Sequence, residues 1–100
     1  MTRLYDTAPM TEQNAEAPLD VRRRRLLFRA THRGTHENDL LVGGYVSRRI
    51  AGLSESDLDA LETILERPDP DLADWLSGRR PIPPDCDSPL LRAMRDAAGA

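Results

Sequence analysis

The sequence predicts an all-α fold, a small five-helix bundle preceded by a disordered N-terminal tail. Three observations support this class. No segment alternates apolar and polar residues with period two, as a half-buried strand would. Apolar residues instead recur three or four positions apart, and Ser, Thr, Asp, Gly and Pro stand where such stretches begin and end. A hydrophobic share of 39% with 4% aromatic residues suits a modest helical core.

The length and composition exclude several classes of protein. One hundred residues allow one small domain, and a dinucleotide-binding unit would nearly fill the chain. No apolar run approaches the ~20 residues that cross a bilayer, so we expect no membrane insertion. The single cysteine, Cys86, cannot form an internal disulfide and indicates a reducing compartment. Because no targeting segment is recognisable either, we expect a cytoplasmic protein.

The N-terminal tail is predicted over residues 1–19, because this stretch is polar and lacks apolar periodicity. It also lacks the apolar segment of a signal peptide. Residues 20–98 form the predicted domain. Asp20 is expected to cap a first helix that runs to Thr31. Its apolar stripe consists of Leu26, Leu27 and Ala30.

A glycine separates the first two predicted helices. Gly34 is expected to end the first helix with a positive φ, and Thr35 to cap a second helix that reaches Ile50. The pair Gly43-Gly44 lies within this second helix. Each glycine costs about 1 kcal/mol relative to alanine there, and the pair permits close packing or a bend.

The third predicted helix, Glu55 to Arg67, has the strongest start signal. Ser54 can cap it, Asp57 follows three residues later, and Leu53 can pack onto Leu58. Its expected inward side chains are Leu58, Leu61, Ile64 and Leu65.

Prolines and a glycine delimit the last two predicted helices. Pro68 ends the third helix, Asp69-Pro70 begins a fourth with proline at its first position, and Gly78 ends the fourth. Ser88-Pro89 opens a fifth helix to Ala97. The expected inward side chains are Leu72, Trp75, Leu76, Leu90, Leu91 and Met94.

Charge is distributed unevenly along the chain, although 14 basic and 17 acidic residues give a net charge of only −3. Residues 21–34 contain six arginines and no acid, whereas residues 54–74 contain eight acids and one base. This asymmetry favours an electrostatically oriented partner. The alternative is a solvated helix face whose arginines partly pair with the acidic helices.

No arrangement of residues indicates catalysis or a metal site. His32 and His36 are four apart, but Gly34 interrupts them and no further ligand completes a set. Aspartates flank Cys86 and disfavour its thiolate. No glycine-rich phosphate loop is present. We therefore expect neither an enzyme nor a bound metal.

The turn from Arg33 to Glu37 is the candidate site, because it puts a cation, a flexible glycine and an acid at a helix junction. One interpretation is a local Arg33–Glu37 pair that closes the turn, worth less than ~1 kcal/mol if exposed. The other is a recognition feature that presents both charges to a partner.

Two blocks of this sequence resemble the SdhE-type flavinylation factor of succinate dehydrogenase. Arg33-Gly34-x-x-Glu37, followed by Asp39, is similar to the Arg-Gly-x-x-Glu signature of that family. The preceding stretch from Arg24 to Ala30 fits the family's first helix. The segment from Leu65 to Trp75 is similar to its Leu-Glu…Asp-x-Asp-Leu…Trp block, in the right order and at the right spacing. The resemblance covers about Val21 to Met94.

The resemblance implies a five-helix assembly factor that is not an enzyme. Such a factor binds the flavoprotein subunit of succinate dehydrogenase, and often that of fumarate reductase. It promotes covalent attachment of FAD to a histidine of that subunit and holds no cofactor stably itself. We expect a monomer.

The family's binding residues carry over to the turn. Arg33, Gly34 and Glu37 would contact the flavoprotein, Asp39 would support them, and His36 lies in the same turn. The sequence departs from the family at Asn38, where an apolar residue is common. It also departs at Thr31 and Ala73, where a larger side chain is common.

The competing class is a small helical regulator, of antitoxin or nucleic-acid-binding type. The arginine run of the first helix would then bind the phosphates of a nucleic acid. However, Phe28 is the only aromatic residue near it, and the net charge of the chain is negative. We therefore expect no nucleic-acid partner.

Overall fold

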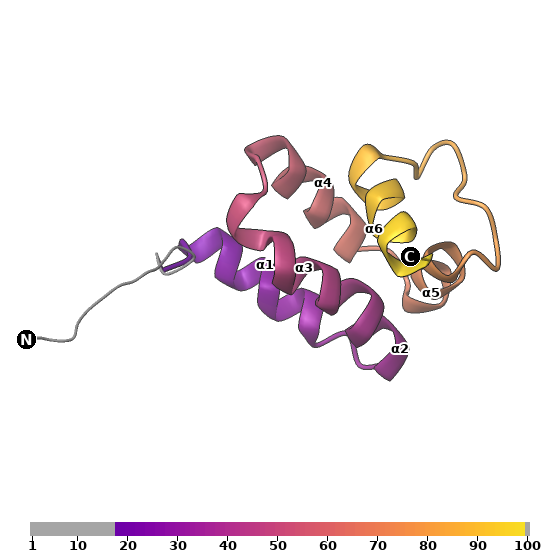
Figure 1. The fold of residues 1–100 in the computed structure, drawn as a ribbon, viewed down its shortest axis with the longest axis horizontal. Helices are drawn as coiled ribbons and strands as arrows, with labels where there is room; N and C mark the ends of the chain where they lie inside the picture. Colours follow the sequence, from indigo (N-terminus) through magenta and orange to yellow (C-terminus); the bar gives the residue numbers. More distant parts are fainter. Residues whose placement is uncertain (1–17, 100) are drawn as a thin grey trace, which may run out of the picture.

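The computed structural model describes residues 18–99, and these residues contain five helices and no strand (Figure 1). The first is α1 (Val21–Thr31). The second is a continuous helix made of α2 (His36–Asn38), a π-helical segment η3 (Asp39–Gly43), α3 (Gly44–Arg49) and a 3-10 turn η4 (Ile50–Gly52). The others are α4 (Glu55–Leu65), α5 (Asp69–Ser77) and α6 (Pro89–Gly99). The predicted all-α, five-helix class is confirmed. The predicted tail, residues 1–19, lies outside the described residues except for Pro18 and Leu19.

The helices begin at the predicted caps. Asp20 accepts a hydrogen bond from the backbone of α1, and Thr35 does the same for α2. Ser54 and Asp57 form the expected capping box of α4, and Ser88 accepts from the first turn of α6. Each cap satisfies an N–H group that the first turn of a helix leaves without an internal partner.

The chain doubles back after α1, so that α1 packs against η3 and α3 on one side and against α4 on another. Helix α6 packs against both α4 and α5, and α2 lies beside α5 (Figure 1). The buried apolar side chains come from every helix: Leu26, Ala30, Val42, Tyr45, Val46, Ile50, Leu58, Leu61, Ile64, Leu65, Leu72, Ala73, Trp75, Leu76, Leu90, Leu91 and Met94. The inward side chains predicted for the last three helices are thus confirmed.

Gly43 allows the closest approach between α1 and the second helix. A Cβ atom built on Gly43 would lie 2.9 Å from the carbonyl oxygen of Ala30 and 3.1 Å from Cα of Thr31. The neighbouring Gly44 meets only the end of the Arg48 side chain, at 3.5 Å. Of the two roles that the sequence left open for the glycine pair, close packing is confirmed, and Gly43 supplies it.

Four predicted boundaries need small corrections. The second helix continues beyond Ile50 as the 3-10 turn to Gly52. Helix α4 ends at Leu65 instead of Arg67, because Pro68 disfavours helical backbone just before it and the chain tightens into a turn there. Helix α5 begins at Asp69, so Pro70 is its second residue. Helix α6 continues to Gly99.

Candidate functional site

Arg33 lies in the loop between α1 and α2, and its side chain turns inward instead of facing solvent. Its Nε donates to Oδ1 of Asp69 at 2.8 Å, and one terminal nitrogen donates to the carbonyl oxygen of Arg67 at 2.8 Å. The other terminal nitrogen donates to the carbonyl oxygen of Leu65. Only 11% of the side chain is exposed. Arg33 therefore joins the candidate turn to the end of α4 and the start of α5.

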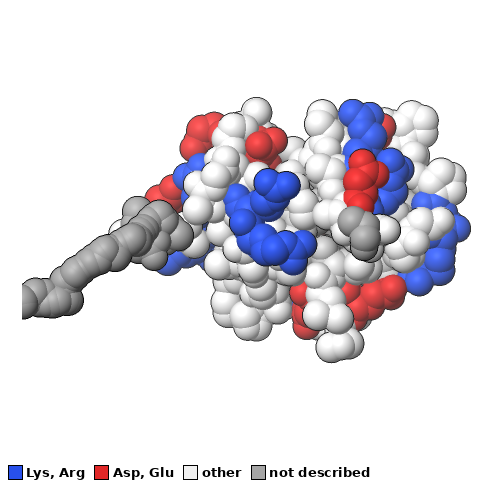
Figure 2. Space-filling model, viewed as in Figure 1, with Lys and Arg blue, Asp and Glu red and all other residues white. Residues whose placement is uncertain are grey.

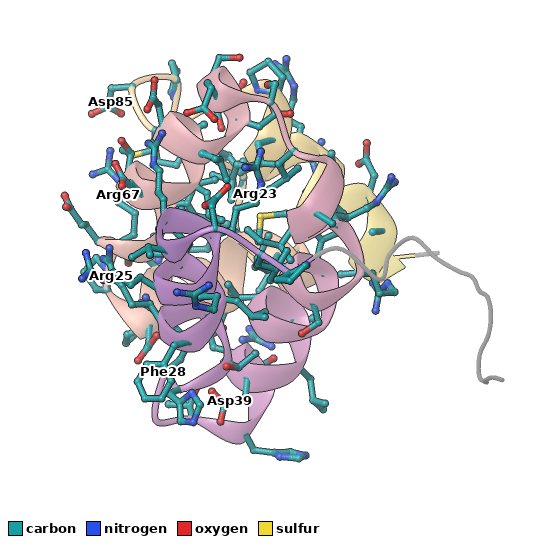
Figure 3. The ribbon with its side chains drawn as sticks, turned by 90° about the vertical axis from the view of Figure 1, so that its left-hand side faces the viewer. Arg23, Arg25, Phe28, Asp39, Arg67 and Asp85 are labelled. Atoms are coloured by element: carbon teal, nitrogen blue, oxygen red, sulfur yellow. The ribbon has the colours of Figure 1, made fainter. Side chains whose placement is uncertain are left out.

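Gly34 and Asp39 shape the turn that follows. Gly34 has φ +95°, a conformation that side-chain-bearing residues rarely adopt, as the sequence predicted. The Asp39 carboxylate accepts a hydrogen bond from the backbone N–H of Arg33 at 2.8 Å and thereby closes the turn. Asp39 lies at the lower end of the molecule in Figure 3. Asp39 thus supports the turn from within.

Glu37 faces outward from α2, and its partner is Arg79. The two terminal nitrogens of Arg79 lie 3.3 Å from the two carboxylate oxygens of Glu37. The Glu37 hydrogen bond raises the pKa of Arg79, and a second bond to Asp74 adds to this shift. Both side chains are about half exposed, so the pair is weak and solvent-accessible. The alternative of a local Arg33–Glu37 pair is wrong, because each residue pairs with a distant partner.

His36 and Asn38 lie on opposite sides of the same short helix. His36 is exposed, next to Glu37. Asn38 is fully buried, and its side-chain amide donates to the carbonyl oxygen of Asp69 at 2.8 Å and to Oδ1 of Asp69 at 3.1 Å. Asn38, where the family often has an apolar residue, therefore binds the same aspartate as Arg33.

Sequence reasoning missed Asp69 and Arg79 as parts of this site. Asp69 falls within the segment from Leu65 to Trp75, the second block that resembles the family, and that resemblance could have indicated its importance. No signal pointed to Arg79, because it lies 42 positions from Glu37 in a loop. The predicted contact of Arg33, Gly34, His36, Glu37 and Asp39 with a partner stays a prediction.

Charges that are separated along the sequence are brought together in the fold. Arg22 of α1 lies 2.9 Å from Glu55 and 2.6 Å from Asp59, two acids of α4. The paired Asp59 raises the pKa of Arg22, with Glu62 contributing further. Figure 2 shows acidic and basic groups side by side on several parts of the face that it draws. Part of the sequence asymmetry is thus internal pairing.

The two histidines do not face a common ion. The ring of His32 stacks on that of Phe28, with ring centres 3.9 Å apart and planes 17° apart. Within residues 18–99, no three His, Cys, Asp or Glu side chains gather as a metal site would require. None of the helices in this range has the length and apolarity needed to cross a membrane.

The described residues form a small helical protein with an exposed turn from Arg33 to Glu37. Hydrogen bonds of Arg33 and Asp39 hold this turn in place. Residues 24–98 match the Sdh5 family, described as the flavinator of succinate dehydrogenase. The chain therefore belongs to this family of succinate dehydrogenase assembly factors.

Individual relatives agree with the family match. The chain is 51% identical to the FAD assembly factor SdhE of Acetobacter pasteurianus over 80 residues, which cover 80% of this chain and 73% of the relative. It is 29% identical to the mitochondrial succinate dehydrogenase assembly factor 2 of Dictyostelium discoideum, over 90% of this chain and 64% of the relative. The corresponding protein of Debaryomyces hansenii is 30% identical over 86% of this chain and 63% of the relative. The chain thus spans less than two thirds of the length of these two mitochondrial proteins.

Proposed function

We propose that this chain binds the flavoprotein subunit of succinate dehydrogenase and promotes covalent attachment of FAD to a histidine of that subunit. Membership of the flavinator family supports the proposal most directly. The similarity to the FAD assembly factor of Acetobacter pasteurianus supports it further. The flavoprotein of fumarate reductase is a second candidate partner, as the resemblance of the sequence implies.

The chain would act by positioning and not by chemistry of its own. The reactive carbon belongs to the flavin, and the histidine that bonds to it belongs to the partner. A factor that selects one arrangement of a mobile partner accelerates such a step by holding its two groups in reach of each other. No catalytic group of this chain is needed for that role.

The turn from Arg33 to Asp39 has the physical properties of a contact element. Gly34 has no side chain, and nothing lies within 4 Å of the position its Cβ would take, so another protein's backbone can approach closely. His36 and Glu37 present polar groups outward beside it. Hydrogen bonds of Arg33 and Asp39 fix the backbone of the turn, so the turn would lose little conformational freedom on binding a partner.

The proposal is tested by the flavin fluorescence of the denatured succinate dehydrogenase flavoprotein, prepared with and without this chain. Denaturation and washing leave only covalently bound flavin. We expect the fluorescence per mole of flavoprotein to rise several-fold when the chain is present. Equal fluorescence in both preparations would overturn the proposed function. The same measurement on the fumarate reductase flavoprotein decides whether that protein is a second partner.

A further inference from the structure

One face of α1 carries a stripe of four exposed side chains. Arg25, Phe28, Arg29 and His32 are spaced three and four residues apart, so they share one side of the helix. All four are exposed, whereas Leu26 and Ala30 face the core. We call these four residues the α1 stripe. Figure 3 shows Arg25 and Phe28 projecting from the same side of the molecule.

Phe28 is the apolar centre of the α1 stripe. It is 61% exposed, and Val21, Phe28 and Leu40 are the large apolar side chains exposed within residues 18–99. The stack on His32 holds its ring in one orientation, and Nδ1 of His32 lies 2.8 Å from the carbonyl oxygen of Phe28. A fixed, flat aromatic surface is the kind of group that anchors protein interfaces.

The arginines of the α1 stripe make no internal ion pairs in the described chain. Arg22, one turn earlier on α1, pairs with three acids of α4, whereas Arg25 and Arg29 pair with no carboxylate of residues 18–99. Like charges four residues apart destabilise a helix, and α1 contains no acid to offset them. Within residues 18–99, the charges of Arg25 and Arg29 therefore add little to the stability of the free protein.

The α1 stripe adjoins the candidate turn. Phe28, Arg29 and His32 line a shallow hollow of about 260 Å³ together with Arg33 and Asp69. Asp69 is the only acid of the hollow, and Arg33 neutralises it. The hollow thus offers an aromatic wall and the guanidinium of Arg29, which pairs with no carboxylate of residues 18–99, beside the turn that we propose as the partner contact.

We propose that the α1 stripe is a second contact surface for the flavoprotein partner, and that it takes an acidic surface segment with an apolar side chain. The carboxylates of that segment pair with Arg25 and Arg29, and its apolar side chain packs on Phe28. This inference rests on the proposed function, because it names how the same partner is held. We infer an acidic occupant because the stripe has a net positive charge and interfaces pair opposite charges.

The test compares two matched charge reversals for binding to the purified flavoprotein. Arg25→Glu/Arg29→Glu reverses the stripe. Arg48→Glu/Arg49→Glu changes the net charge equally on α3, where both arginines are also exposed and pair with no described carboxylate. We expect the stripe variant and Phe28→Ala to raise Kd at least tenfold, and the α3 variant to stay within twofold. Circular dichroism checks that every variant keeps its helical content.

Covalent flavin yield separates this inference from the proposed function. We expect the stripe variants to lose yield at low concentration and to recover it at saturating concentration, since the turn is intact. If the wild-type chain raises the yield but the stripe variants bind as tightly as it does, the second surface is wrong and the proposed function stands. If the wild-type chain neither binds nor raises the yield, the proposed function fails and this inference with it.

Two further outcomes overturn the inference. Equal weakening by the α3 and stripe reversals would show a response to net charge alone. Alternatively, the wild-type chain could bind a labelled single-stranded oligonucleotide of 20 random bases, with affinity that falls steeply with salt and is lost in the stripe variant. That result would assign the arginines and Phe28 to nucleic acid.

Discussion

Arg33 and Asp69 lie 36 positions apart in the sequence, yet Nε of the first donates to Oδ1 of the second at 2.8 Å. The aspartate begins α5, and the arginine precedes the turn that leads into α2. Two more Arg33 hydrogen bonds reach carbonyl oxygens at the end of α4. The side chain of Arg33 thus connects the candidate turn to the end of α4 and the start of α5.

Arg33→Ala should destabilise the fold by about 2–4 kcal/mol, because it removes the cation from a mostly buried carboxylate, which keeps only the Asn38 donor, and leaves two carbonyl groups without the Arg33 donor. Arg33→Lys should recover only part of this, since an ammonium group lacks the planar fork of donors. Urea denaturation measures both. Arg92→Ala is the control: it removes a half-exposed pair with Asp87 and should cost less than about 1 kcal/mol. Equal losses for the two alanine variants would contradict the account.

Gly34→Ala should cost roughly 1–2 kcal/mol, because φ is +95° and alanine adopts this conformation only with strain. Steric overlap does not contribute, since nothing lies within 4 Å of the added Cβ. Gly52→Ala has the same open surroundings without a positive φ, so it should leave the stability nearly unchanged. Thermal unfolding of the two variants provides the comparison, and an equal Tm would show that the backbone at Gly34 is not strained by a side chain.

Gly43→Ala should destabilise the protein by about 1–3 kcal/mol, because its methyl group would press on the backbone of Ala30 and Thr31. The adjacent Gly44→Ala should be neutral or stabilising, since its Cβ meets only a flexible arginine and alanine favours a helix. Chemical denaturation of both variants tests the difference. A more stable Gly43→Ala would mean that α1 and η3 do not approach as closely as described.

The acid dependence of stability should include a contribution from Asp74. Hydrogen bonds from Arg79, and then from Arg80, lower the pKa of Asp74 below its ordinary value of 3.8. Because the folded pKa lies below the unfolded one, this contribution is present above pH 3.8 and is lost as the pH falls through the folded value. Asp74→Asn should therefore lower Tm slightly at pH 7 and converge with the wild type at lower pH.

The control for this titration is Asp85→Asn, whose carboxylate forms no ion pair in the described chain and which should leave Tm unchanged at both pH values. A deficit of Asp74→Asn that stays constant from pH 7 to pH 2 would show that ionisation of Asp74 is not its cause.

Local signals allowed most of the fold to be predicted. Caps such as Ser54 and the positive φ of Gly34 depend on neighbours within a few residues, so the sequence reveals them. The π-helical segment η3 was not predicted, because the spacing of apolar residues does not distinguish it from an α-helix. The close approach of Gly43 to Ala30 and Thr31 is likewise a contact between two helices that no local pattern shows.

The candidate site was only partly predictable for the same reason. The turn itself is local, but the partners of its charges lie far away in the sequence. Arg33 pairs across 36 positions and Glu37 across 42. Nothing in the spacing of the residues shows that the first charge is internal and the second exposed, although this difference decides which of them a partner can reach.

Under the proposed function, the Glu37 side of the turn contacts the flavoprotein. Covalent flavin in the denatured flavoprotein, measured with Glu37→Ala and with Glu55→Ala, is the sharpest check of that contact. Both residues are exposed glutamates paired to an arginine, so the two variants lose similar contacts within the fold. We expect at least a tenfold lower flavin yield with Glu37→Ala and an unchanged yield with Glu55→Ala, at equal Tm. A full yield with Glu37→Ala would contradict it.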